Sequence, residues 1–164
     1  RRLTLRPLQD SDAGLISLYV GDERVALNLA VVPHPYPAGA AEAYIEYSRA
    51  PDTDEIIWVM ELNGELIGVI SISPWEAARG KIGYWLAPQF WGAGFTPEAL
   101  EAVIAYARGN GFEQLEASVH QGNYGSARVL IKEGFEYIGD HETHSIPRNG
   151  MVKSWRYKLA MGDG

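Results

Sequence analysis

Short apolar segments recur along the chain, and their pattern predicts about seven β-strands. Arg2 to Arg6, RLTLR, alternates polar and apolar residues and is ended by Pro7. Ile56 to Leu62 and Glu65 to Ser73 are almost continuously apolar, which indicates a sheet covered on both faces. Further strands are expected at Lys81 to Leu86, Gln114 to Val119, Phe135 to His144 and Met151 to Ala160.

Apolar residues spaced three or four positions apart predict four helices between these strands. Ser11-Asp12 opens the first helix, and the alanine-rich segment Ala38 to Ala50 forms the second. The third carries Leu100 and Val103 on its apolar face, and the fourth runs from Asn123 to Glu133.

Two Asn-Gly pairs, Asn63-Gly64 and Asn149-Gly150, predict tight hairpin turns, because such turns need a positive φ at both central residues. The element order β-α-α-β-β-β-α-β-α-β-β contains a central strand-helix-strand unit, which requires a parallel, right-handed crossover. We therefore expect an α/β (α+β) fold. It would be a single domain over residues 1–164, with a mixed, mostly antiparallel sheet and helices on both faces.

Composition excludes several classes of function. The chain has 164 residues and a formal net charge of −7, which argues against a nucleic-acid partner because phosphate backbones attract basic surfaces. No run approaches the ~20 apolar residues that span a membrane, and the start, RRLTLRPLQDSD, is too polar for a signal peptide. Because the sequence has no cysteine, a cysteinyl acyl-enzyme is excluded, and we expect a cytoplasmic protein. The edge strands of the last hairpin leave a homodimer open.

The stretch Gln89 to Leu100, QFWGAGFTPEAL, joins a predicted strand to a predicted helix. Gly92 and Gly94 allow backbone N–H groups to approach one ligand. With Thr96 as the N-cap and the next residue, proline, at the first helical position, the free amides of the first turn favour a phosphate. The alternative is a glycine-softened turn before a capped helix, without a ligand.

Two other known phosphate-binding loop motifs do not match this sequence. A dinucleotide fingerprint needs a third glycine where Pro97 stands, and a nucleoside-triphosphate loop needs Gly-Lys-Ser/Thr. The remaining pattern, Gln-x-x-Gly-x-Gly before a helix, resembles the pyrophosphate-binding motif of the GNAT superfamily of N-acetyltransferases, which bind acetyl-CoA. LRPLQDSD, PHPYP, GYWLAPQFWGAGFTPEAL and NYGSARVLIKEGF resemble its ribosomal-protein N-terminal acetyltransferase branch, and together they span Leu5 to Phe135.

The resemblance implies where acetyl-CoA would bind. Two central parallel strands would separate to hold it, and the strand end at Trp85, Leu86 and Ala87 would bind the pantetheine arm through its backbone. Asn123 would also contact the arm, or serve only as a helix N-cap. The implied pyrophosphate loop consists of Gln89, Phe90, Trp91, Gly92, Ala93, Gly94, Phe95 and Thr96.

The resemblance also assigns part of the chemistry. Many relatives use a tyrosine to protonate the departing thiolate, but Leu130 stands at that position, and the matching residue of the branch is Ser126. Ser126 would then be catalytic, or it bonds only to the backbone at a helix start. Lys81 occupies the place where relatives often have a glutamate base, so the general base is unidentified; the earlier Glu76 lies on the preceding loop.

The residues that would contact the acceptor amine are less clearly indicated than those for the cofactor. His34 and Tyr36 lie in a loop that lines the acceptor in this family, and such loops also serve packing alone. His120 follows a predicted strand, where it approaches the site or has a structural role. His141 and His144 are three apart on a predicted strand and point to opposite faces, so we expect no metal site.

The function that follows is transfer of an acetyl group from acetyl-CoA to a primary amine by direct attack. A peptide α-amine, with a pKa near ~8, needs less help from a base than a lysine side chain near ~10.4, so a protein N-terminus is favoured. The alternatives are a small-molecule amine, such as an aminoglycoside, polyamine or amino-acid analogue, and a catalytically silent acyl-CoA sensor.

Overall fold

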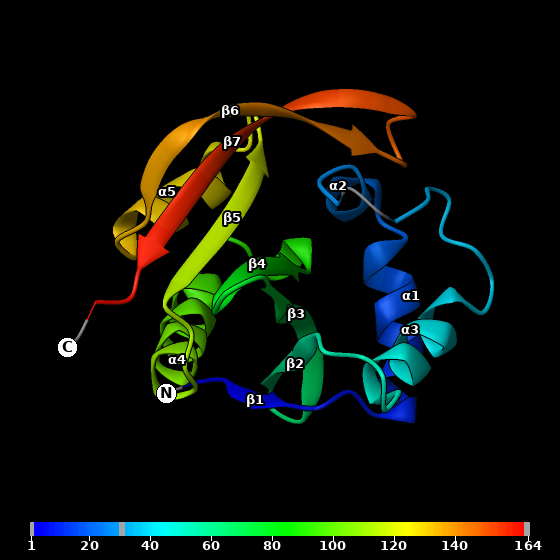
Figure 1. Ribbon diagram of the computed structural model, residues 1–164. Helices are drawn as coiled ribbons and strands as arrows, with labels where there is room; N and C mark the ends of the chain where they lie inside the picture. Colours follow the sequence, from blue (N-terminus) through cyan, green and yellow to red (C-terminus); the bar gives the residue numbers. More distant parts are fainter. Residues whose placement is uncertain (1, 30–31, 163–164) are drawn as a thin grey trace.

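The computed structural model describes residues 2–29 and 32–162, which form a seven-stranded sheet with helices on both faces (Figure 1). The strand order in the sheet is β1-β2-β3-β4-β5-β7-β6. The strands are β1 (Thr4–Arg6), β2 (Ile56–Leu62), β3 (Glu65–Trp75), β4 (Arg79–Leu86), β5 (Gln114–His120), β6 (Glu136–Ser145) and β7 (Gly150–Ala160). The prediction of a mixed, mostly antiparallel sheet is confirmed.

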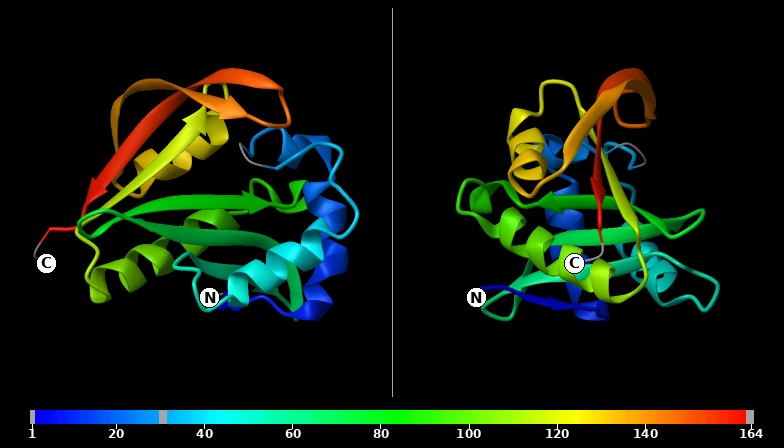
Figure 2. Two further views of the ribbon diagram at one scale, coloured as in Figure 1. Left: turned by 45° about the vertical axis from the view of Figure 1, so that its right-hand side comes forward. Right: turned by 60° about the vertical axis from the view of Figure 1, so that its left-hand side comes forward.

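The parallel pair β4–β5 is the exception in an otherwise antiparallel sheet. Arg79 to Lys81 pair with Gln114 to Glu116, and the two strands then separate. Each keeps its outer partner, because β4 pairs with β3 as far as Leu86 and β5 pairs with β7 as far as His120. Figure 2 shows the two halves of the sheet diverging from this short contact.

Two hydrophobic clusters explain why β3 is apolar along most of its length. Ile67, Ile70 and Ile72 face the cluster that includes α4, whereas Leu66 and Val69 face the cluster that includes α1 and α3. A strand buried on both faces needs apolar residues at successive positions, as its pattern predicted. The helices are α1 (Ala13–Val20), α2 (Glu23–Ala26), α3 (Ala40–Arg49), α4 (Phe95–Gly109) and α5 (Tyr124–Lys132).

The first hairpin turn is confirmed, since Asn63 and Gly64 have φ values of 52° and 86°. The start of α4 differs from the prediction. The N-cap is Gly94, in the left-handed region, so Thr96 already lies in the first turn. The buried Phe95 ring and the Glu98 carboxylate, which accepts a hydrogen bond from the Leu3 amide at 2.8 Å, hold the chain there. Because of these tertiary contacts, the helix begins two residues earlier than the sequence predicted.

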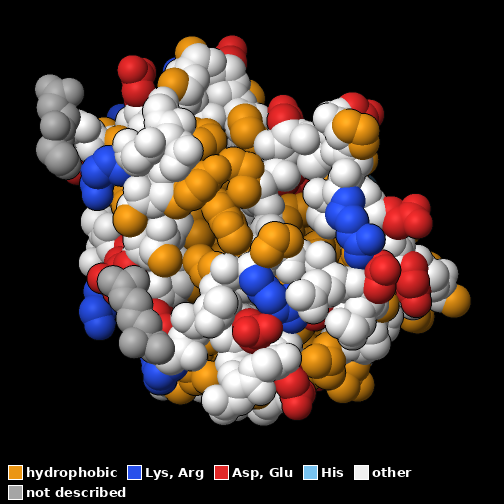
Figure 3. Space-filling view, turned by 90° about the horizontal axis from the view of Figure 1, so that it is seen from below, with side chains coloured by type: hydrophobic (Ala, Val, Ile, Leu, Met, Phe, Trp, Pro, Cys, Tyr) orange, Lys and Arg blue, Asp and Glu red, His pale blue; other side chains and the backbone are white. Residues whose placement is uncertain are grey.

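Three short elements escaped the sequence pattern: the four-residue helix α2 and the 3-10 turns at Asp10–Asp12 and Pro88–Phe90. They are too short to show a hydrophobic period. Among the described residues, no helix is long and apolar enough to cross a bilayer. The face seen in Figure 3 carries acidic and basic side chains side by side around a central group of hydrophobic ones.

Arg6 joins the first strand to its neighbours through two carboxylates. Its guanidinium donates to both oxygens of Asp12, at 2.8 and 2.9 Å, and its Nε donates to Glu61 at 2.5 Å. The Asp12 side chain is only 4% exposed and also accepts a hydrogen bond from the Gln9 amide at 2.7 Å. Burial raises the pKa of Asp12, but the bonds from Arg6 and Gln9 outweigh it and hold that pKa below its ordinary value.

We expect Asp12→Asn to lower the free energy of unfolding by about 2 to 3 kcal/mol at pH 7, because it removes the more buried of the two carboxylates that pair with Arg6. The Asp12 pKa is depressed in the folded state, so this stability is present above the unfolded pKa and disappears as the pH falls through the folded one. Denaturant unfolding of the variant and of the wild type should therefore converge on acidification.

Asp10→Asn is the matched control, because Asp10 lies in the same 3-10 turn and pairs with Arg49. Its side chain is 87% exposed, and such surface pairs contribute less than about 1 kcal/mol. Equal losses in the two variants, or a difference that does not depend on pH, would contradict the role given to Asp12.

Candidate functional site

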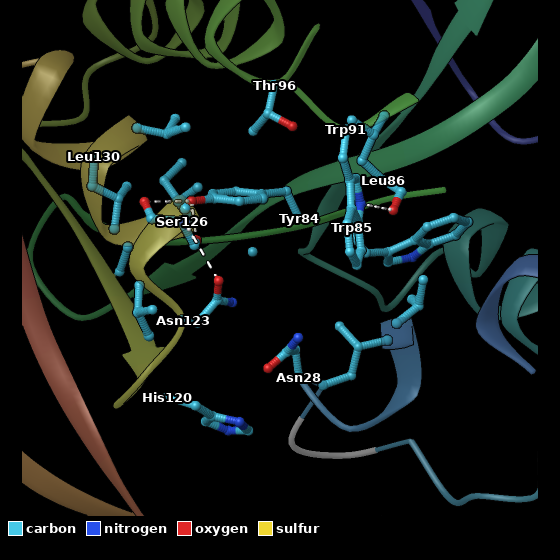
Figure 4. Close-up of a pocket in the computed structure, with 18 of the residues that line it drawn as sticks. Asn28, Tyr84, Trp85, Leu86, Trp91, Thr96, His120, Asn123, Ser126 and Leu130 are labelled. Carbon is cyan, nitrogen blue, oxygen red and sulfur yellow. Dashed lines mark hydrogen bonds between the residues drawn. The ribbon is translucent and has the colours of Figure 1, made fainter. Parts of the chain in front are cut away.

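A pocket of about 680 Å³ opens where β4 and β5 separate. Ile82 to Leu86 of β4 form one wall and Ala117 to His120 of β5 form the opposite wall. The loop of residues 89–96, called the glycine loop below, closes one end through Gly92 and Gly94. Helix α5 contributes Ser126 and Leu130, and α2 borders the other end through Arg24. Figure 4 shows Thr96 and Trp91 at one end of this pocket, His120 and Asn28 at the other, and Tyr84 with Ser126 between them.

The separation leaves one edge of β4 available to a ligand. The Ala87 amide donates to the Ile67 carbonyl on β3, whereas the Leu86 carbonyl accepts a hydrogen bond from the Trp91 indole at 2.7 Å. Because backbone groups of successive strand residues point to opposite sides, those of Tyr84 and Ile82 face the pocket like those of Leu86. An extended amide chain in the pocket would find alternating donors and acceptors there.

The glycine loop brings the start of α4 to the pocket. Gly92 and Gly94 have φ values of 78° and 83°, which favour glycine, and Phe95 begins a helix of 15 residues. Gly92, Gly94, Phe95 and Thr96 line the pocket, so the free N–H groups and the positive end of the helix dipole lie beside it. This arrangement suits an anion such as a pyrophosphate.

Other residues of the predicted loop face elsewhere. The Gln89 side chain donates to the Tyr19 hydroxyl at 3.2 Å, and the Phe90 ring packs edge-on against Phe95. Ala87, Gln89, Phe90 and Ala93 are not among the described residues that line the pocket. Their contact with a cofactor stays a prediction.

Ser126 and Tyr84 form a hydrogen-bonded pair inside the pocket. The two hydroxyl oxygens are 2.5 Å apart, and Ser126 stands in the first turn of α5. Burial raises the pKa of Tyr84 to about 12, so its phenol stays protonated at neutral pH. Either hydroxyl can be the donor in this pair, and the Ser126 carbonyl, 3.4 Å from the Tyr84 oxygen, is a second acceptor for the Tyr84 proton.

Helix α5 and its N-cap contain two further residues that the sequence singled out, Asn123 and Leu130. Asn123 is the N-cap, and its side chain accepts a hydrogen bond from the Ser126 amide at 3.4 Å, so the structural role is confirmed. Asn123 also lines the pocket, and its contact with a cofactor stays a prediction. Leu130, which stands where many relatives have a tyrosine, is fully buried beside the pocket and supplies no proton.

The far end of the pocket is polar and carries His120. The Nδ1 atom of His120 is buried and has no hydrogen-bond partner among the described residues. Burial lowers the pKa of His120, the Arg148 guanidinium lowers it further, and a hydrogen bond to the Leu27 carbonyl opposes them. Thr143 and Ser154 lie at the same end. The sequence left a site role for His120 open beside a structural one.

The predicted acceptor residues lie outside this pocket. Tyr36 packs against the cluster around α1 and α3, and neither it nor His34 is among the described lining residues. Lys81 is directed toward Trp75, with Nζ 5.9 Å from the ring centre, and Glu76 is exposed beside Arg79. Contact of His34 and Tyr36 with an acceptor stays a prediction.

No aspartate or glutamate is found among the described residues that line the pocket, although the chain contains 21 of them. The charged side chain in the lining is Arg24, which is paired with Asp22 at 2.7 Å. The pocket therefore offers a cationic ligand no carboxylate from these residues.

Comparison with known proteins identifies a family. The sequence profile described as "Acetyltransferase (GNAT) domain" matches residues 2–136. The uncharacterized N-acetyltransferase p20 of Bacillus licheniformis is 27% identical over 174 aligned positions, which cover 96% of this chain and 92% of that protein.

Solved structures show the same fold at low sequence identity. Ribosomal-protein-S5-alanine acetyltransferase from Vibrio fischeri superimposes with a TM-score of 0.81 at 19% identity, over 99% of this chain and 95% of that one. Spermidine N-acetyltransferase from Vibrio cholerae, solved with coenzyme A and spermine, has a TM-score of 0.83 at 17% identity, over 98% and 96%.

Gly94→Glu should abolish binding of acetyl-CoA, because a carboxylate at the start of α4 repels a pyrophosphate there. A ligand at a hundred times its dissociation constant stabilises the folded state by about 2.7 kcal/mol, so the wild type should melt several degrees higher with acetyl-CoA and the variant should not.

Gly39→Glu is the matched control for backbone strain. Gly39 is also an N-cap glycine with positive φ, 81°, at the start of α3, and an added Cβ meets no atom within 4 Å. Both variants should lose about 1 to 2 kcal/mol of stability, yet Gly39→Glu should keep the shift caused by acetyl-CoA. A shift that survives in Gly94→Glu would remove the glycine loop from the cofactor site.

Proposed function

The chain belongs to the GNAT family of acetyltransferases, and on this premise we propose that it acetylates a primary amine by direct attack in the pocket between β4 and β5. Acetyl-CoA is the acyl donor of this family. The observation that supports the proposal is the Ser126–Tyr84 pair, two hydroxyl groups that lie in the pocket between the glycine loop and the polar end and could donate a proton. Residues 1–164 would act as one catalytic domain.

Different parts of the pocket would bind different parts of acetyl-CoA. The free amides at Gly94 to Thr96 would hold the pyrophosphate, and the open edge of β4 would bind the amide groups of the pantetheine arm. Such a placement brings the thioester toward the Tyr84 side of the pocket. Backbone N–H groups of β4 would then stabilise the charge that develops on the thioester oxygen.

Ser126 would protonate the departing thiolate. With Tyr84 as the donor in this pair, the hydroxyl proton of Ser126 would be free to point into the pocket. A thiol with a pKa near ~8.5 is a weak base as a thiolate, so a hydroxyl relay suffices to protonate it. Tyr84 would orient the serine and return a proton to it.

For the acceptor, we propose a peptide N-terminal α-amine. The absence of carboxylates among the described lining residues disfavours a polyamine, whose further cations need charged partners. The solved neighbours include both a ribosomal-protein-alanine acetyltransferase and a spermidine acetyltransferase, so similarity alone favours neither acceptor. Cytoplasmic location and a homodimer stay predictions.

An acceptor panel at pH 7 tests this choice. About a tenth of an α-amine with pKa ~8 is neutral, against about 0.04% of a lysine side chain near ~10.4. A peptide with a free N-terminus should therefore react about 10²-fold faster than the same peptide with a blocked N-terminus and a free lysine. A higher kcat/KM for spermine would reverse the assignment, and no thiol release with any amine would leave a silent sensor.

Ser126→Ala should lower kcat by about 10²-fold, as expected for loss of a general acid, and should leave the dissociation constant of acetyl-CoA within about twofold. Tyr84→Phe should cost about tenfold, since Ser126 remains but is no longer oriented. Ser118→Ala is the control, because Ser118 lines the same pocket and bonds His141 instead. Thiol release measured with each variant decides the matter, and an unchanged kcat in Ser126→Ala would reject the assignment.

A further inference from the structure

The two halves of the glycine loop differ in how they can be held. The first half has large side chains that bond to other elements, since the Gln89 amide donates to the Tyr19 hydroxyl and the Trp91 indole donates to a carbonyl of β4. Residues 92–94, Gly-Ala-Gly, have no side chain larger than a methyl group, and glycine gains the most freedom when a loop loosens. A contact from elsewhere in the chain is therefore needed to fix the second half.

The side chain of Arg2 makes three contacts with this half and with the start of α4. Its Nη1 atom donates a hydrogen bond to the Ala93 carbonyl at 2.8 Å, between the two glycines. Its guanidinium lies over the Phe95 ring, with Cζ 4.1 Å from the ring centre, and its Nε donates to Glu98 at 3.2 Å. One side chain from the residues before β1 thus holds both the loop and the first turn of α4.

We infer that Arg2 is a positioning residue for acetyl-CoA, because it holds the glycine loop in the shape that presents its amides to the pyrophosphate. The inference rests on the proposed function. Arg2 is not among the described residues that line the pocket, whereas Gly92, Gly94 and Thr96 are. It therefore acts through the backbone of the loop and not by touching the cofactor.

The shape of the Arg2 side chain matters more here than its charge. Because the Glu98 carboxylate lies beside it, the positive charge of Arg2 is largely offset for an anion at the start of α4. A planar guanidinium can stack on a ring and donate from separate nitrogens in fixed directions, whereas a lysine ammonium is a point charge on a flexible stem. The Leu3 amide bonds the second oxygen of Glu98 at 2.8 Å, so this carboxylate is itself fixed.

A loop that is already ordered binds its ligand more tightly, because the ligand does not have to order it. Arg2→Met should therefore raise the dissociation constant of coenzyme A about tenfold, as measured by titration calorimetry. Arg2→Lys keeps the charge but loses the planar fork, so its dissociation constant should stay within threefold of that of Arg2→Met. Should Arg2→Met fail to fold, Arg2→Lys carries the test alone.

Arg49→Met is the matched control for the loss of an exposed arginine. The side chains of Arg2 and Arg49 are both 48% exposed, and each pairs with one carboxylate, Glu98 or Asp10. Arg49 is not among the described residues that line the pocket. Its replacement should leave the dissociation constant of coenzyme A within twofold of the wild-type value.

Kinetics with two acyl donors separate an effect on the loop from a general loss of structure. S-acetyl-pantetheine carries the thioester and the pantetheine arm but no pyrophosphate, so the loop has nothing to bind in it. With acetyl-CoA, Arg2→Met should have a KM about tenfold higher and an unchanged kcat, the sign of lost ground-state binding. With S-acetyl-pantetheine, its kcat/KM should stay within twofold of the wild-type value.

The outcomes separate this inference from the proposed function. A dissociation constant that is unchanged in Arg2→Met, or that Arg2→Lys restores to the wild-type value, would overturn the role of Arg2. Equal losses with both donors would make that role merely structural and overturn it as well. If the wild type binds coenzyme A but releases no thiol with any amine, the proposed function falls, and calorimetry still decides the role of Arg2. If the wild type does not bind coenzyme A, both fall.

Discussion

The early end of the β4–β5 ladder is the constraint on which the site depends. Parallel strands joined by a helix need a crossover, and here α4 provides it while the ladder lasts only from Arg79 to Lys81. Beyond that point β3 and β7 hold the two strands apart, each on its outer edge. Backbone groups on the inner edge of β4 are therefore left facing a pocket, and backbone groups removed from water require partners. The fold therefore leaves these backbone groups available to an extended, amide-bearing ligand.

Much of this architecture follows from local signals in the sequence. The turn at Asn63-Gly64, the buried strand from Leu66 to Ile72 and the two glycines before α4 each carry a local signal in the sequence, and these signals predicted the structure. The start of α4 did not follow, because Gly94 caps the helix without a side chain and the buried Phe95 fixes its first turn. A tertiary contact decided between two acceptable N-caps.

The site residues were harder to predict because they meet across elements. Ser126 and Tyr84 are 42 positions apart, and their contact depends on how α5 packs over β4. Tyr84 drew no attention in the sequence, where it belongs to an apolar strand; a hydroxyl at a position predicted to be buried was the available signal. His120 lines the pocket because β5 separates from β4 before it reaches this residue, which no local pattern encodes. His34 and Tyr36 were chosen from a loop whose path the sequence does not determine.

One contact joins two segments that are remote from each other in the sequence. The Arg148 side chain, on the turn between β6 and β7, donates to the Leu27 carbonyl at 2.8 Å, 121 positions away along the chain. Both partners lie in segments that the sheet does not need for its core, and surface turns of this kind tolerate changes in length and composition. Over evolutionary time, this turn and the segment around α2 can therefore change while the glycine loop and the separation of β4 from β5 stay intact.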